Sequence, residues 1–108
     1  MSNCYRYEFK KGDYSIGILT GLDEFFTVDE ICELCWIFER DLKCPNVDME
    51  NTISFFTERG NRKFRKAIRK IKNIADTKNL DFSCIIKPFD KLKNIVYQDN
   101  YQVILKNP

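Results

Sequence analysis

The sequence predicts an α+β protein in the order ββαβαβββ, with a mostly antiparallel sheet and two helices packed on one face. Three observations support this class. Strand-like segments lie near both ends of the chain, two segments between them carry apolar residues at helical spacing, and turn residues separate the elements. With 108 residues, 44% of them hydrophobic and 14% aromatic, the chain predicts a single domain over residues 1–108 and excludes a disordered tail or a coiled coil.

Residues 4–20 predict a β-hairpin. Tyr5, Tyr7 and Phe9 alternate with charged residues, which is typical of a strand with one buried face. Residues 11–13, Lys-Gly-Asp, provide the turn, and the second strand is expected to run through residues 14–20.

A first helix is expected from residue 28 to about residue 43. Thr27 and Glu30 have the spacing of a capping box, and Pro45 prevents the helix from continuing. Its predicted apolar face consists of Val28, Ile31, Leu34, Cys35, Phe38 and Leu42.

The opposite face of this helix combines acidic and large apolar residues. Exposed aromatic side chains flanked by charge are typical of protein-binding surfaces, so this face predicts a contact with a protein partner. The residues assigned to that contact are Trp36, Ile37, Asp29 and Glu33. In the alternative, Trp36 packs laterally against the sheet edge or a chain terminus.

The second half of the chain predicts a strand at 52–56, a helix that follows residues 57–60 and ends near residue 78, and a strand at 80–87. Asn79 is suited to end the helix. Residues 93–97 and 101–106 flank a third turn at 98–100 and are expected to form a closing hairpin.

The second helix carries the strongest charge signal in the sequence. Residues 59–79 contain nine basic residues and one acidic residue, whereas residues 22–50 contain two basic and nine acidic residues. Its apolar side consists of Phe64, Ala67, Ile68, Ile71, Ile74 and Ala75. The basic stripe, as we name the other side, consists of Arg62, Lys63, Arg65, Lys66, Arg69, Lys70 and Lys72. Such a stripe predicts binding to nucleic acid or to an acidic protein groove, because guanidinium groups bind phosphate and carboxylate in bidentate fashion. The alternatives are a solvated helix face or neutralisation by the acidic segment.

The chain contains five cysteines and no histidine. An odd number of cysteines without a secretory signal is typical of a reduced, cytoplasmic setting. Cys32, Cys35 and Cys44 resemble half of a zinc site, but the pair lies inside a predicted helix, so we expect these cysteines to pack as small apolar residues. A zinc-stabilised fold is the alternative.

The sequence also lacks a glycine-rich phosphate loop and the common hydrolase motifs. We therefore expect no enzymatic activity, no cofactor and no small-molecule substrate. No apolar run approaches the roughly 20 residues that a membrane span requires, so we expect no membrane partner.

Three stretches carry a resemblance: YSIGILTG at 14–21, ISFFTERGNRKFRKAI at 53–68 and NIVYQDNYQVIL at 94–105. Together they resemble small single-domain proteins of phages and mobile elements of low-GC Gram-positive bacteria, including anti-CRISPR proteins. The resemblance implies a non-enzymatic inhibitor in the bacterial cytoplasm that binds a type II CRISPR effector protein, its guide RNA, or both. It would block effector assembly or target cleavage.

An RNA- or DNA-binding regulatory module that uses the basic helix by itself is the alternative function. A homodimer is a further expectation left open by the sequence, since an uncovered sheet edge can pair with a second copy.

Overall fold

The computed structural model describes residues 2–42 and 50–107, without the side chains of Lys11, Tyr14, Leu19, Glu33, Cys35, Trp36 and Glu39. The elements are β1 (Asn3–Lys11), β2 (Tyr14–Gly17), α1 (Ile18–Phe25), α2 (Val28–Asp41), β3 (Thr52–Phe56), α3 (Glu58–Lys63), α4 (Arg65–Thr77), β4 (Asp81–Pro88), the 3-10 helix η1 (Phe89–Lys91), β5 (Ile95–Gln98) and β6 (Gln102–Lys106). This arrangement confirms the predicted α+β class.

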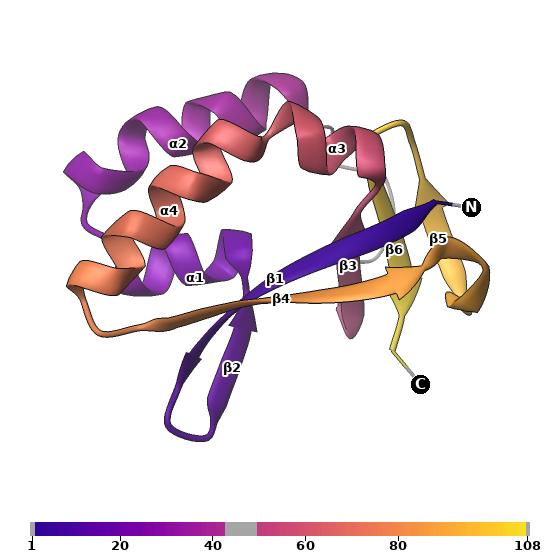
Figure 1. Cartoon of the computed structure of the whole chain (residues 1–108), viewed down its shortest axis with the longest axis horizontal. Coiled ribbons are helices and arrows are strands. Elements are labelled where there is room, and N and C mark those ends of the chain that lie inside the picture. Colours follow the sequence, from indigo (N-terminus) through magenta and orange to yellow (C-terminus); the bar gives the residue numbers. More distant parts are fainter. Residues whose placement is uncertain (1, 43–49, 108) are drawn as a thin grey trace.

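β1 organises the six-stranded sheet, in which the strand pairs are antiparallel. β4 lies along the whole of one edge of β1, with Asn3 opposite Pro88 and Lys10 opposite Asp81. On its other edge β1 pairs first with β3, at Tyr5, and then with β2. β6 and β5 continue the sheet from β3, and Figure 1 shows these strands turned away from β1 and β4.

Figure 1 also shows the helices gathered on one side of β1 and β4. The main hydrophobic core lies in this space and contains Phe9, Leu34, Phe38, Phe56 and Phe64, among others. A smaller cluster of Cys4, Phe55, Leu92 and Val103 lies apart from it. Within the residues that the structure describes, no helix is both long enough and apolar enough to cross a membrane.

The segment after β2 is a helix, so the prediction of a strand through residue 20 is wrong. β-branched and aromatic residues favoured a strand there, but Ile18, Leu22 and Phe26 recur every four residues and all three are buried. Gly21 permits the close packing, because a Cβ at this position would overlap the ring of Phe9.

The predicted second helix is divided into α3 and α4 at Phe64. This residue has φ −98° and ψ 13°, outside the helical range, and its side chain is only 1% exposed. Its ring centroid lies 5.1 Å from that of Phe38 and 5.6 Å from that of Phe56. The sequence predicted two helices, whereas the described residues form four α-helices. The sequence did not predict α1, and the basic helix is interrupted where Phe64 enters the core.

Other local predictions are confirmed. Thr27 and Glu30 form the capping box at the start of α2, with both reciprocal hydrogen bonds present. Asn79 adopts φ 57° after α4, the left-handed conformation that ends many helices. The strand at 52–56 and the closing hairpin are also present.

Candidate nucleic-acid interface

The helices α3 and α4 hold their basic residues outward because their apolar residues anchor them in the core. Ala67, Ile68, Ile71 and Ala75 are buried, as the spacing predicts. The residues between them must therefore face solvent, since one helical turn advances by 3.6 residues.

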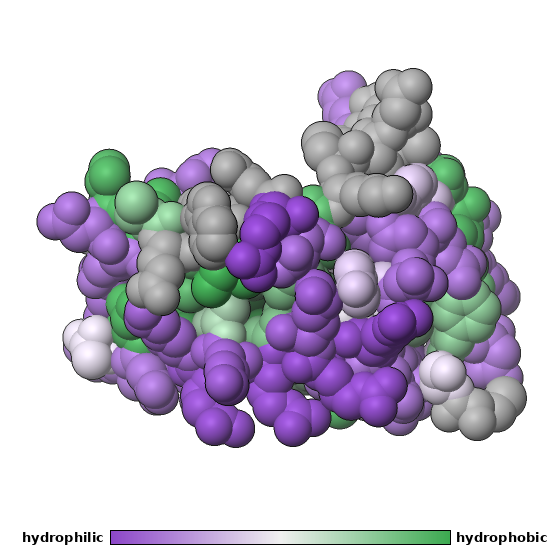
Figure 2. Space-filling view, turned by 90° about the horizontal axis from the view of Figure 1, so that it is seen from above, coloured by the Kyte–Doolittle hydropathy of each residue, from purple (hydrophilic) through white to green (hydrophobic). Residues whose placement is uncertain are grey.

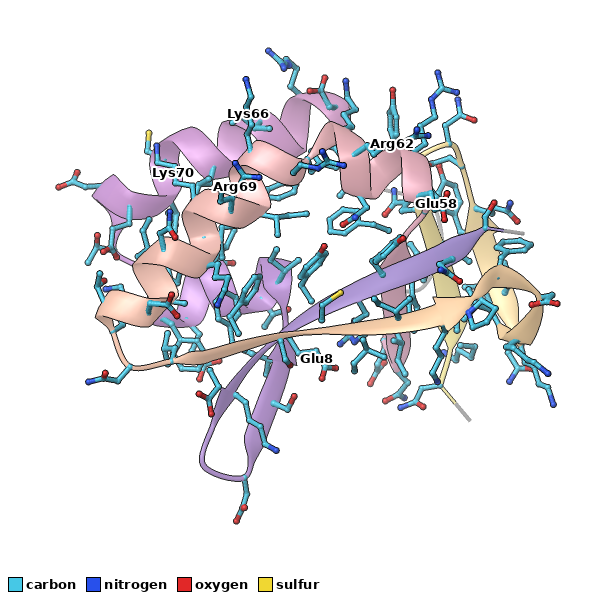
Figure 3. The ribbon with its side chains drawn as sticks, in the orientation of Figure 1. Glu8, Glu58, Arg62, Lys66, Arg69 and Lys70 are labelled. Carbon is cyan, nitrogen blue, oxygen red and sulfur yellow. The ribbon has the colours of Figure 1, made fainter. Side chains whose placement is uncertain are left out.

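All seven residues of the basic stripe are exposed. Figure 3 shows Arg62 on α3 and Lys66, Arg69 and Lys70 following along α4, with their side chains directed away from the core. Figure 2, which views the molecule from above, shows mainly hydrophilic surface on this side, interrupted by small apolar areas.

Only part of the stripe is matched by acidic residues of the same molecule. The Lys63 Nζ lies 3.8 Å from the Asp41 Oδ2, and the Lys72 Nζ lies 3.8 Å from the Asp76 Oδ1. Four other members make no ion pair with any carboxylate whose side chain the structure describes. They are Arg62, Arg65, Lys66 and Arg69. Among the side chains that the structure describes, internal neutralisation therefore accounts for only part of the positive charge of the stripe.

A groove of about 400 Å³ runs beside the stripe, between the helices and the β1–β4 strand pair. Its lining residues are Tyr7, Asn61, Arg65, Ile68, Arg69, Lys72, Phe82, Ser83 and Cys84. The helical side of the groove provides three cations, and the strand side provides two aromatic rings. This volume falls within the range of ordinary small-ligand sites.

The two rings on the aromatic side of the groove contact each other, and one of them is hydrogen-bonded to α3. The rings of Tyr7 and Phe82 are stacked, with centroids 5.6 Å apart and planes inclined by 14°. The Tyr7 hydroxyl donates a hydrogen bond to the Asn61 Oδ1, which ties β1 to α3. Burial raises the pKa of Tyr7 well above its ordinary value, and the neighbouring Cys84 adds to this effect. The phenol is therefore neutral at physiological pH, and no negative charge from Tyr7 opposes an anion in the groove.

The sequence predicted the cations of this site but not its aromatic side. Tyr7, Asn61, Phe82, Ser83 and Cys84 were not assigned to any site. The alternation at Tyr5, Tyr7 and Phe9 indicated an inward-facing row, and Phe82 lies directly opposite Phe9. No local pattern in the sequence indicates that β4 pairs with β1. This pairing brings Tyr7 and Phe82 together and creates the strand side of the groove.

The structure describes only part of the predicted protein-contact surface on α2. Ile37 packs partly buried against the main core, so the expectation that it faces solvent is wrong, and its contact with a protein partner stays a prediction. The predicted apolar face is otherwise largely confirmed, with Leu34 and Phe38 in the core and Ile31 and Leu42 packed against it. The exception is Val28, which is 78% exposed at the start of the helix. Asp29 is exposed, whereas the side chains of Trp36 and Glu33 lie outside the described part of the structure, so their role stays a prediction.

The cysteines do not form a described metal site. Cys32 is exposed and free, Cys35 is described only in its backbone, and Cys44 lies outside the described residues. Among the described residues, no group of three or more cysteine or acidic side chains is arranged to hold a metal ion.

A search of protein-family models, of curated proteins and of solved structures finds none that matches this chain. Its function is therefore inferred from the basic stripe and the groove.

Proposed function

We propose that the protein is a non-enzymatic, single-stranded nucleic-acid-binding protein that holds the phosphate backbone on its basic stripe. The observation that carries this proposal is the set of four exposed cations without a described acidic partner: Arg62, Arg65, Lys66 and Arg69. Phosphates are the polyanion that such a row of guanidinium and ammonium groups recognises best.

The groove favours a single strand over a duplex. Proteins that bind single strands combine a cationic track with aromatic rings on which bases stack. Here Arg65 and Arg69 border the same groove as Tyr7 and Phe82, so one base can enter it while the neighbouring phosphates remain on the helix. In a duplex the bases are stacked and paired, and none is free to enter.

The test is a titration of labelled single-stranded RNA, single-stranded DNA and duplex DNA, followed by fluorescence anisotropy. The variant R65E/R69E reverses two cations beside the groove. The matched control K91E/K93E makes the same change in net charge at exposed residues on and after η1. We expect R65E/R69E to weaken single-strand binding by roughly tenfold or more and the control to retain most of it.

Circular dichroism verifies that both variants fold, which is expected because all four residues are exposed. Equal losses in the two variants would show that binding depends on net charge alone. Preferential binding to the duplex would refute the role of the groove. No binding to any of the three nucleic acids would refute the proposal.

A second candidate is the anti-CRISPR-like inhibitor, in the bacterial cytoplasm, of a type II CRISPR effector or its guide RNA. The resemblance in three stretches favours it, and so does the exposed acidic residue Asp29 at the start of α2, which offers a second surface of opposite charge. An inhibitor of this kind binds the effector strongly and bare RNA weakly. Unimpaired cleavage by a purified effector with excess protein would eliminate it for that effector.

A further inference from the structure

β4 presents a long uncovered strand edge. It pairs with β1 over all eight of its positions, and no described residue pairs with its other edge. Seven of its eight residues are exposed, Phe82 being the exception. Ile85 and Ile86 are 37% and 56% exposed, which is unusual for large aliphatic residues on an edge strand. An edge of this kind is a template for pairing with another strand.

The other two edges of the sheet are less suited to pairing. β2 and β5 have four residues each. The pairing of β5 with β6 also has an irregularity between Ile95 and Tyr97, and such bulges disrupt the regular hydrogen-bonding edge. β4 is twice as long, and its pairing with β1 is continuous from Asp81 to Pro88.

The residue order of β4 is complementary to itself in one register. When two identical strands pair antiparallel about a two-fold axis, one residue must lie opposite its own copy. If Cys84 takes that position, Asp81 lies opposite Lys87 of the second copy, and this occurs twice. Phe82 then faces Ile86 of the second copy, so an apolar pair follows the charged pair. Centring the strands on Ser83 or Ile85 instead separates Asp81 from Lys87.

We propose that two copies of this chain associate through β4, antiparallel and centred on Cys84, to form one continuous sheet. Opposed residues in an antiparallel pair point to the same face. The helices of both copies therefore lie on one side of the joined sheet. Because Ser83 and Cys84 also line the groove, the two grooves adjoin across the axis. This proposal does not depend on nucleic-acid binding.

The first test measures the molar mass in solution by sedimentation over a range of protein concentrations. We expect a concentration-dependent dimer in the unmodified chain. K87D places two carboxylates opposite each other at both ends of the interface and weakens the dimer by about tenfold or more. Lys87 lies opposite Cys4 on its own β1, so the substitution places no charged residue directly opposite the new carboxylate within the monomer.

The exchange D81K/K87D is the matched rescue, because it restores opposite charges across the axis. Since Asp81 lies opposite Lys10 on its own β1, circular dichroism verifies that this variant keeps its fold. We expect it to recover most of the dimer. A chain that stays monomeric at millimolar concentration would overturn the proposal. A dimer that responds equally to K87D and D81K/K87D would also overturn it, since such a dimer uses another register or another edge.

Disulfide trapping provides a second, independent readout. Directly opposed residues in an antiparallel pair have Cα atoms about 4.5–5.5 Å apart, within the range that a disulfide spans. Mild oxidation with copper phenanthroline should link Cys84 to its copy. C84S should abolish this product, whereas C32S, which removes another exposed cysteine, should retain it. A crosslink that persists in C84S would count against the proposed axis.

Discussion

At the scale of single residues, Gly60 shows how closely α3 and the closing hairpin approach each other. A Cβ at this position would overlap the backbone carbonyl of Tyr101. The same carbonyl accepts a hydrogen bond from the Thr57 N–H at 3.0 Å, so it has little freedom to move. Gly60 is therefore required by the junction between the basic helix and β6.

We expect Gly60→Ala to lower the free energy of unfolding by about 1–3 kcal/mol, the cost typical of overpacking. Urea denaturation measures this directly. Arg59→Ala, one position earlier and exposed, should change stability by about 0.5 kcal/mol or less. Equal stability of the glycine and alanine forms would show that the hairpin shifts without cost.

Asp99 organises the turn between β5 and β6. Its carboxylate accepts hydrogen bonds from the Tyr101 N–H at 2.8 Å, the Gln102 N–H at 3.0 Å and the Tyr97 hydroxyl at 2.8 Å. Burial by itself raises the pKa of this group, but the hydrogen bonds, that from Tyr101 first, outweigh burial and lower it. The folded state therefore favours the charged form.

A pKa that is lower in the folded than in the unfolded chain stabilises the fold above the unfolded value, which is about 3.9 for aspartate. This contribution is lost as the pH falls through the folded pKa. We expect Asp99→Asn to be less stable than the parent at pH 7 and to lose less stability on acidification. Denaturation at pH 7 and at about pH 3 tests both points. Asp90→Asn, the same substitution at an exposed residue on η1, is the matched control.

At the scale of elements, α2 depends on its capping box and on an ion pair with the end of the basic helix. The Glu30 Oε1 accepts a hydrogen bond from the Thr27 N–H at 2.8 Å and lies 2.9 Å from the Lys78 Nζ. The hydrogen bond from Thr27, followed by the interaction with Lys78, lowers the pKa of Glu30. One carboxylate thus links the start of α2 to the residue that follows α4.

We expect Thr27→Ala to lower the free energy of unfolding by about 1 kcal/mol, because an N–H at the first turn of α2 loses its acceptor. Thr27→Ser retains the hydroxyl and should recover most of that loss. Thermal or urea denaturation of the two variants provides the comparison. A loss shared by both would indicate that the methyl group, rather than the cap, provides the stability.

At the scale of the whole molecule, the charge distribution determines which surface of the protein attracts a polyanion. Among the described side chains, acidic residues of α2 pair with the basic helices at Lys63, through Asp41, and at Lys78, through Glu30. The cations of Arg62, Arg65, Lys66 and Arg69 produce a field that extends into solvent and is screened by salt over about 8–10 Å at ordinary ionic strength.

The slope of log K against log salt for single-strand binding should therefore increase in magnitude with the number of phosphates that the protein contacts. Each one contributes a slope of about −0.7 in log K against log salt, so the four unmatched cations predict a slope near −3. R65Q/R69Q should reduce its magnitude by roughly 1.4, whereas K91Q/K93Q should leave it nearly unchanged. Anisotropy titrations at four salt concentrations are sufficient. A slope unaffected by R65Q/R69Q would place the phosphates elsewhere.

Much of this structure was predictable because it depends on neighbours in sequence. The α+β class, the capping box at Thr27, the helix end at Asn79 and the buried side of α4 all follow from patterns within a few residues. The exposure of the basic stripe follows from the same spacing, since burying Ile68 and Ile71 turns the intervening lysines and arginines outward.

The local patterns were wrong where packing with distant residues decided the outcome. Residues 18–25 became a helix because Ile18, Leu22 and Phe26 bury together. Ile37 packs against the core beside the predicted apolar face of α2, which is broader than its spacing indicated. Phe64 interrupts the basic helix because rings from α2 and β3 receive its side chain.

The sequence by itself determined which residues carry charge and which side of each helix is apolar enough to be buried. Only the tertiary structure decided that β4 lies beside β1, some 75 residues away along the chain. That pairing creates both the groove with its aromatic side and the uncovered strand edge. The physical reason is that charge and helical periodicity are properties of short segments, whereas strand pairing is selected by the packing of the whole core.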